Sequence, residues 1–254
     1  YGPGNPVLWN GNDGGVYETH DRGETWRHMN SMALGQFYAV AFDYRKPYWV
    51  YGGLQDNGSW GQPPQASRAG LSWWDAVGVG GGDGFHVQVD PNDWSTLYSE
   101  SQGGAVARWD LKTGAARSIR PRPAEGERLR FNWSTPIVLS PHNSRTVYVG
   151  ANRLFRSVNR GDSWEAISPD LTTNDPTKLR PGVNSVTPED TGAERHCTIV
   201  TISESPLLPG VIYVGTDDGL VHVTRDGGKS WTNLTANLKG LPSNTWCSRV
   251  TASK

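Results

Sequence analysis

The chain repeats a pattern of short apolar runs that end in an aromatic residue and are followed by a glycine-rich turn. The aligned aromatics are spaced 42, 47, 50 and 65 residues apart; they are Trp9, Tyr51, Tyr98, Tyr148 and Tyr213. A further apolar run precedes most of them, which predicts strands at residues 37–43, 85–90, 136–140 and 198–203. Because helical periodicity is essentially absent, the pattern predicts strand–turn–strand units rather than helices.

A turn that ends in tryptophan occurs three times, at residues 19–26, 157–164 and 224–231. Its template is Ser/Thr-x-Asp/Asn-x-Gly-x-Ser/Thr-Trp. The Asp or Asn side chain accepts nearby backbone N–H groups, and the glycine supplies a positive φ. These turns are therefore interpreted as structural, with the residues Asp21, Trp26, Asn159, Trp164, Asp226 and Trp231. Two further copies are degenerate, at residues 108–114 and 70–74.

Four strands per repeat at these spacings predict an all-β fold, a β-propeller of four-stranded antiparallel blades. We expect about five blades in a single domain spanning residues 1–254, at residues 36–78, 84–120, 131–170, 196–240, and 5–30 together with 246–254. Residues 246–251 resemble residues 196–201, so the C-terminal strand is expected to complete the N-terminal blade and close the ring. The alternative is an excerpt of a larger propeller, and a start at Tyr1 rather than Met favours a processed form or a fragment.

Composition agrees with an all-β chain that has many turns and large aromatic side chains. There are 31 Gly, 17 Pro and 12 Trp in 254 residues, of which only 35% are hydrophobic. The formal net charge of −1 gives no indication of nucleic-acid binding. No apolar run approaches the roughly 18 residues that indicate a membrane-spanning helix, so membrane insertion is not expected. No cofactor is expected.

The Trp-ending turns, the Tyr-x-Gly strand ends and the turns at residues 53–58 and 80–85 resemble those of bacterial Asp-box (BNR) repeat proteins. Such proteins are often described as sortilin-like or glycosyl hydrolase, and they are related to xyloglucanases and sialidases. The resemblance covers essentially the whole chain, although family members are generally longer. It implies a propeller, an extracellular or periplasmic location, and a glycan or a protein as partner.

A ligand face is expected where the turns between second and third strands meet the blade-to-blade connections. Asp13, Asp56, Asp83, Asp217 and Asp218 should converge there. Aromatic residues should join them, namely Tyr38, Phe85, Trp60, Trp133 and Trp246, with Phe37 and Trp73 nearby. Carboxylates that hydrogen-bond hydroxyl groups and rings that cover C–H faces together suit a sugar.

A glycosidase needs two carboxyl groups across the scissile bond. The resemblance to xyloglucanases points to Asp13 in residues 12–17 and to Asp83 in residues 82–85, with Asp56 as a further candidate. The first turn has its Asp one residue nearer the glycines than the family's Asp-x-Gly-Gly-x-Tyr, and the second is shorter than Gly-Asp-x-x-Gly-Phe. The alternative for Asp13 and Asp217 is a turn-capping role, since Asp-Gly turns are common.

Cys197 and Cys247 take matching positions in the strand alignment, so a disulfide is one reading and free thiols are the other. No zinc-type ligand spacing is present, so no metal site is expected, although Asp217 and Asp218 leave a calcium site conceivable. The long segment 170–196 is expected to be a loop over the ligand face.

Two function classes follow from these observations. The first is a carbohydrate-binding or glycosidase-like propeller that acts on a polysaccharide or glycan. The second is a sortilin-like protein- or peptide-interaction propeller, or a structural scaffold without catalysis. Facing carboxylates across an open cleft would favour the first class.

Overall fold

The computed structural model describes residues 7–12, 14–29, 35–65, 73–179, 192–193 and 195–254. The chain divides into two compact units, residues 1–36 and residues 37–254. The first unit contains a three-stranded antiparallel sheet in the order β1-β2-β3. Its strands are β1 (Leu8–Asn12), β2 (Gly15–Thr19) and β3 (Arg27–His28).

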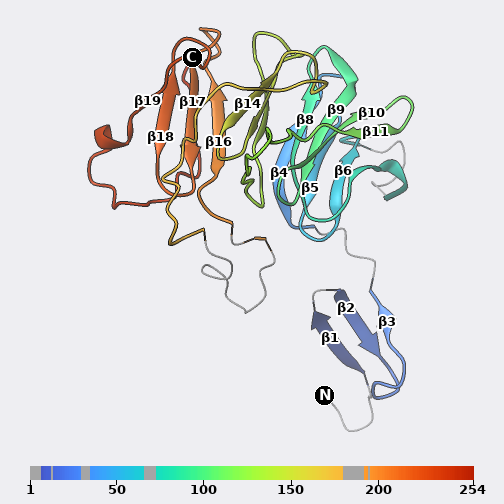
Figure 1. Cartoon of the computed structure of the whole chain (residues 1–254). Helices are drawn as coiled ribbons and strands as arrows, with labels where there is room; N and C mark the ends of the chain where they lie inside the picture. The colour runs from blue at the N-terminus through green and yellow to red at the C-terminus, as the bar shows by residue number, and fades with distance from the viewer. Residues whose placement is uncertain (1–6, 13, 30–34, 66–72, 180–191, 194) are drawn as a thin grey trace. The chain divides into compact units, whose positions relative to one another are not determined.

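The second unit contains four antiparallel sheets of four strands each (Figure 1). Sheet I comprises β4 (Phe37–Phe42), β5 (Val50–Leu54), β6 (Gly58–Gln62) and β7 (Val77–Gly80). Sheet II comprises β8 (Gly84–Asp90), β9 (Asp93–Ser101), β10 (Ala105–Asp110) and β11 (Ala115–Ser118). Sheet III comprises β12 (Ile137–Leu139), β13 (Val147–Gly150), β14 (Leu154–Ser157) and β15 (Glu165–Ala166). Sheet IV comprises β16 (Ile199–Glu204), β17 (Ile212–Thr216), β18 (Val221–Thr224) and β19 (Thr232–Asn233).

The prediction of an all-β chain made of four-stranded antiparallel sheets is confirmed. The helical elements in the described residues are two short 3-10 turns, η1 (Trp73–Asp75) and η2 (Thr235–Asn237). None of the described helical segments is long and apolar enough to cross a membrane. The first strands β4, β8, β12 and β16 neighbour one another in that order, which is a propeller-like arrangement.

The core lies between the sheets, in three clusters of buried side chains. Each cluster contains one of the aligned tyrosines: Tyr51 between sheets I and II, Tyr98 between II and III, and Tyr148 between III and IV. All three are at most 3% exposed. In sheets I to III the aromatic repeat therefore marks the residue of the second strand that packs against the next sheet, whereas Trp9 in the first unit is 56% exposed.

The Trp-ending turns connect the third and fourth strands in sheets III and IV, and β2 and β3 in the first unit. All three are held by local hydrogen bonds. In the first unit Asp21 accepts the backbone N–H of Thr25 at 2.9 Å and the Thr19 hydroxyl at 2.6 Å. The Thr25 hydroxyl also donates to Asp21, and the bonds from the two hydroxyls lower the pKa of the Asp21 carboxyl. Asp226 accepts the equivalent bonds from Ser230 and Thr224.

Two of these tryptophans also form a hydrogen bond between their own sheet and the preceding sheet. The Trp164 indole N–H donates to the Ile119 carbonyl at 2.6 Å, and the Trp231 indole donates to the Ile167 carbonyl at 2.9 Å. Each acceptor follows directly after a fourth strand of the preceding sheet. Trp26, in the first unit, is 44% exposed.

Glycine at the end of the second strand lets the next sheet approach closely. A Cβ at Gly53 would lie 2.3 Å from the backbone of Gly84 and Phe85, and one at Gly150 would lie 2.7 Å from the Ile199 side chain. These distances are too short for any side chain, so the Tyr-x-Gly motif has a steric cause. Sheet II has Glu100 at this position.

Candidate functional site

Asp83 lies in the glycine-rich loop between β7 and β8, where sheets I and II meet. Its Oδ1 accepts the backbone N–H of Asp56 at 2.6 Å, so the loop is tied to the β5–β6 turn. In the same place Gly58 donates its N–H to the Gly82 carbonyl at 2.8 Å. Asp56 has a positive φ of 60° and is exposed to solvent. The Asp83 carboxylate is therefore held against the backbone of a second acidic residue, Asp56, in the preceding sheet.

Aromatic side chains surround these two acidic residues. The Tyr38 ring packs on Phe85 with a centroid separation of 4.5 Å, and its hydroxyl donates to the Gln55 side chain at 3.1 Å. Burial first, and then the charges of Asp83 and Asp56, raise the pKa of Tyr38. The Trp60 indole donates to the Asn57 carbonyl at 2.6 Å, which fixes an indole that is 38% exposed.

We call Tyr38, Asp56, Trp60, Asp83 and Phe85 the Asp83 cluster. Asp83 is 9% exposed and Tyr38 is 45% exposed, so the cluster offers acceptor oxygens beside an accessible ring. Phe85 was expected to contact a ligand with its ring, but it is 1% exposed because Tyr38 and the core cover it. Its contribution is to support Tyr38.

The remaining expected residues lie elsewhere. Asp13 falls outside the described residues. Asp217 and Asp218, in the β17–β18 turn, are each 1% exposed and accept hydrogen bonds from protein groups. Trp133 is half-buried before β12, and Trp246 is 53% exposed after sheet IV. One bond, from the Asp56 N–H to the Asp83 carboxylate, joins two of the expected acids, whereas the Asp217 side chain accepts hydrogen bonds from Thr198 and Asn132.

Cys197 and Cys247 are free thiols, so the disulfide reading is wrong. The reason is a register offset of two residues. The Ile199 N–H donates to the Ala151 carbonyl, and the Cys247 N–H donates to the equivalent Thr216 carbonyl. Cys247 therefore occupies, against sheet IV, the position that Ile199 occupies against sheet III, which is two residues away from the position of Cys197.

Glu100 is a functional group that the sequence analysis did not single out. It is 1% exposed, and its Oε1 accepts the backbone N–H groups of Thr135 and Gly104. Its Oε2 makes no hydrogen bond of normal geometry to the described residues, although the backbone N–H of His86 also acts on the carboxyl. Burial raises the pKa of Glu100 well above the usual range. The available signal was a glutamate at the position where the other sheets of the second unit have the glycine of Tyr-x-Gly.

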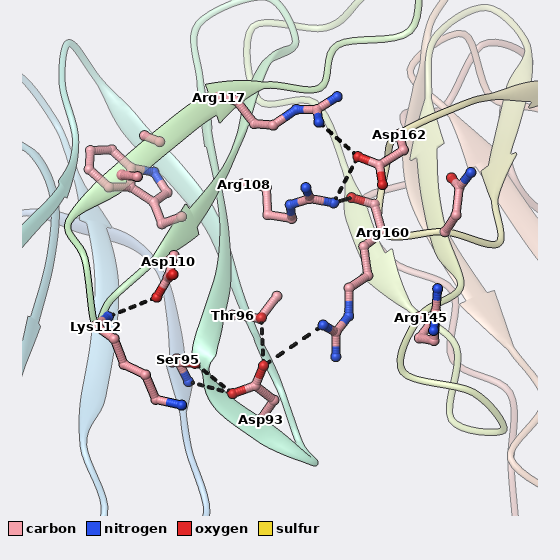
Figure 2. A pocket seen from close by; sticks show the side chains of 14 residues that line it. Asp93, Ser95, Thr96, Arg108, Asp110, Lys112, Arg117, Arg145, Arg160 and Asp162 are labelled. Carbon is pink, nitrogen blue, oxygen red and sulfur yellow. Dashed lines mark hydrogen bonds and ion pairs between the residues drawn. The ribbon is translucent and has the colours of Figure 1, made fainter.

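A cavity of about 640 Å³ lies at the opposite edge of the sheets, beside the Trp-ending turn of sheet III (Figure 2). Three of its arginines take part in ion pairs, whereas Lys112 and Arg145 make none among the described residues. Asp162 contacts Arg108 at 3.1 Å and Arg117 at 2.9 Å, while Arg160 contacts Asp90 at 2.8 Å. The cavity is therefore an ion-paired junction between sheets II and III.

No family model matches the chain, and no curated protein matches it. Solved structures do match at low identity. The GH74 enzyme of Niastella koreensis is 14% identical with a TM-score of 0.38, covering 96% of this chain and 50% of that one. The GH74 xyloglucanase of Xanthomonas campestris is 14% identical with a TM-score of 0.37, covering 89% and 50%. The computationally designed protein Ika8 is 11% identical with a TM-score of 0.44, covering 96% and 62%. The chain thus spans between half and two thirds of these structures.

Proposed function

We propose that this chain is a carbohydrate-binding or glycosidase-like propeller that takes a polysaccharide at the Asp83 cluster. The observation that carries the proposal is the bond between Asp56 and Asp83, which holds two acidic residues of consecutive sheets beside the accessible Tyr38 ring. Carboxylate oxygens accept hydrogen bonds from sugar hydroxyls, and aromatic faces cover apolar C–H groups.

In the glycosidase form of this proposal, one carboxyl group protonates the leaving oxygen and the other acts as base or nucleophile. Asp83, Asp56 and Asp13 are the candidates for these two roles. Tyr38 positions the sugar ring, and Trp60 extends the platform from β6. Trp133, Trp246, Asp217 and Asp218 remain proposed as more distant ligand contacts.

The test combines binding with product release. The chain is incubated with xyloglucan and mixed-linkage glucans, and affinity gel shift and new reducing ends are measured for wild type, Asp83→Asn and Tyr38→Ala. Glu125→Gln, which changes an exposed carboxylate in the segment before β12, is the matched control. Binding that Tyr38→Ala weakens and Glu125→Gln leaves unchanged would support a glycan site.

Reducing ends that Asp83→Asn abolishes while binding persists would support catalysis. Unchanged binding in both cluster variants, with folding intact by circular dichroism, would refute this placement of the site. Asp13→Asn is assayed in parallel, because the xyloglucanase resemblance points to it as the second acid.

We also propose that the chain closes as a ring of five sheets, with residues 246–252 as the first strand of the sheet that contains β1–β3. Two hydrogen bonds join these residues to β16. The Val250 N–H donates to the Thr201 hydroxyl, and the Ala252 N–H donates to the Ser203 hydroxyl. A Cβ at Gly215 would lie 2.4 Å from the Cys247 sulfur. The equivalent Cβ at Gly150 would lie 2.7 Å from the Ile199 side chain, so Cys247 approaches sheet IV as Ile199 approaches sheet III.

Closure makes a prediction about Trp26. In a closed ring its indole would donate to the Leu234 carbonyl, since Leu234 follows β19 as Ile119 follows β11 and Ile167 follows β15. Trp26→Phe should then lower the unfolding temperature of the chain as Trp231→Phe does. A loss with Trp231→Phe and none with Trp26→Phe would favour the excerpt reading.

A further inference from the structure

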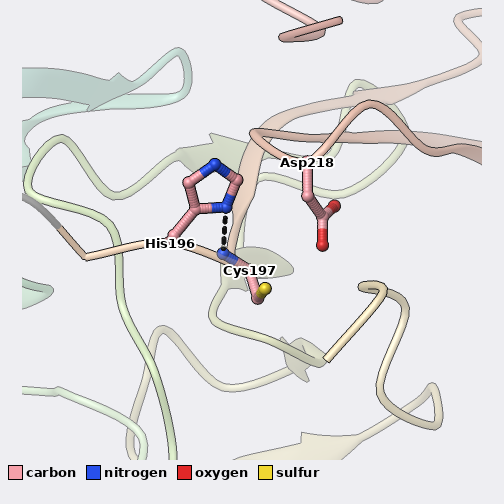
Figure 3. A group of neighbouring side chains, drawn as sticks. All are labelled: His196, Cys197 and Asp218. Atoms are coloured by element: carbon pink, nitrogen blue, oxygen red, sulfur yellow. Dashed lines mark hydrogen bonds between the residues drawn. The ribbon is translucent and has the colours of Figure 1, made fainter. Parts of the chain in front are cut away.

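Three side chains of different donor chemistry gather at one end of sheet IV. His196 and Cys197 lead into β16, and Asp218 lies in the β17–β18 turn (Figure 3). One ligand atom from each, an imidazole nitrogen, the thiol sulfur and a carboxylate oxygen, lies within 4.8 Å of the other two. The spacing of these residues along the chain conceals the group, because Asp218 comes 21 positions after Cys197.

This combination of donors suits Zn²⁺, which binds thiolate, imidazole and carboxylate in tetrahedral geometry. With metal–ligand bonds of about 2.0–2.3 Å, neighbouring tetrahedral ligand atoms lie roughly 3.3–3.8 Å apart. The observed group therefore needs to contract by about 1 Å to enclose the ion. Three protein ligands leave a fourth position for water.

The charge balance of the region provides an independent observation. Asp217 and Asp218 are adjacent and each is 1% exposed. Within the described part of the chain, the ion pair that either carboxylate makes is the one between Asp217 and His196 at 3.4 Å. The nearby Arg130 is paired with Asp170 at 2.7 Å. Two buried carboxylates thus face one ionisable imidazole, and a divalent cation would offset the remaining negative charge.

The hydrogen bonds of the group leave a lone pair free on Asp218 Oδ1, whereas the lone pair of His196 Nδ1 is occupied. Asp218 Oδ2 accepts the N–H and the hydroxyl of Thr173, both at 2.7 Å, and Oδ1 accepts the Thr216 hydroxyl at 2.5 Å. His196 Nδ1 accepts the Cys197 N–H at 2.9 Å, so it is the unprotonated nitrogen in the neutral ring, and it lies on the side toward Cys197 (Figure 3). Binding requires this nitrogen to exchange the N–H for the ion, or the ring to turn.

We propose that His196, Cys197 and Asp218 bind one Zn²⁺ ion. The bound ion would tie distant parts of the chain together, because Thr173 and His196 bound the long segment between sheets III and IV. Thr173 already bonds Asp218, and its hydroxyl lies 3.7 Å from the Cys197 sulfur. The metal fixes both ends of that segment to the β17–β18 turn, while the Cys197 thiol releases its proton to solvent on binding.

The test uses the full chain, freed of metal with a chelator and then titrated with Zn²⁺ alone. We expect one equivalent to be retained after gel filtration and to raise the unfolding temperature. Co²⁺ should give the near-ultraviolet absorption of a thiolate–Co²⁺ bond. Cys197→Ser should abolish this absorption, while Cys247→Ser, which removes the other thiol, should preserve it.

Asp218→Asn and His196→Gln should weaken Zn²⁺ binding by more than the roughly 10–100-fold that loss of an outer-shell partner causes. His196 is partly exposed, so its variant keeps the test decisive if Cys197→Ser fails to fold. The proposal is overturned if wild type retains no Zn²⁺, if His196→Gln binds as tightly as wild type, or if the Co²⁺ absorption depends on Cys247.

Discussion

Tyr51 and Tyr98 occupy the same position in consecutive sheets, yet their hydroxyl groups have opposite surroundings. The Tyr51 hydroxyl donates to Asp43 at 3.1 Å and accepts from Arg45 at 2.7 Å. The Tyr98 hydroxyl is buried and has no hydrogen-bond partner among the described residues. Both residues are at most 1% exposed, so the change to phenylalanine removes the same atom from an equally buried site.

Tyr51→Phe should lower the free energy of unfolding by about 1.5–3 kcal/mol, because hydrogen bonds to charged groups contribute this much. Asp43 and Arg45 keep their own contact at 2.6 Å, which places the expected loss toward the lower end. Tyr98→Phe breaks no bond and removes an unsatisfied hydroxyl. Stability should therefore stay unchanged or rise by up to about 1–2 kcal/mol.

The assay is urea unfolding of both variants and wild type, followed by tryptophan fluorescence and circular dichroism together. If the dependence of the unfolding free energy on urea concentration is unchanged and only the urea midpoint shifts, the substitution has changed stability alone. Equal destabilisation by the two substitutions would refute the reasoning, because it would mean that the Tyr98 hydroxyl is bonded or that both effects come from ring packing.

Three further predictions concern the junctions between sheets. Burial raises the pKa of Glu100, so the folded chain holds a proton there that the unfolded chain loses above about pH 4.3. From that pH toward the folded pKa, wild type should lose about 1.4 kcal/mol of stability per pH unit relative to Glu100→Gln, which is measured as the difference between their urea midpoints from pH 4.5 to 7. If the stabilities of wild type and Glu100→Gln changed in parallel with pH, the raised pKa of Glu100 would be refuted. Gly53→Ala should cost about 1–3 kcal/mol or more because its Cβ would meet backbone at 2.3 Å, while Gly81→Ala, with nothing within 4 Å, should leave the thermal midpoint nearly unchanged. Trp164→Phe should cost about 1 kcal/mol through the lost bond to Ile119, and no shift in its thermal midpoint would show that this bond does not fasten the sheets.

The parts of the fold that could be predicted from sequence have local causes. A Trp-ending turn is held by bonds among eight consecutive residues, as from Thr25 to Asp21, so its residue types alone identify it. The aromatic spacing identified the four-stranded sheets because one buried tyrosine, such as Tyr98, packs at each junction between sheets.

What could not be predicted depends on how one sheet approaches the next. Phe85 looked like a ligand-facing aromatic, but the ring of Tyr38 covers it. The sequence alignment paired Cys247 with Cys197, whereas backbone bonding pairs it with Ile199. A strand repeat specifies which residues alternate, but it leaves the register between neighbouring sheets open by two residues, since such a shift keeps the same face buried.

Glu100 shows why one junction between sheets differs from the others. Between sheets III and IV, a backbone N–H donates to a backbone carbonyl, from Ile199 to Ala151. Between sheets II and III, the Thr135 N–H instead donates to the Glu100 carboxyl at 3.1 Å. The side chain thus takes the role of a carbonyl where glycine elsewhere allows backbone to approach. This exchange introduces an ionisable group into a buried junction, and it adds to the pH dependence of the second unit's stability a contribution that a Tyr-x-Gly strand end would not make.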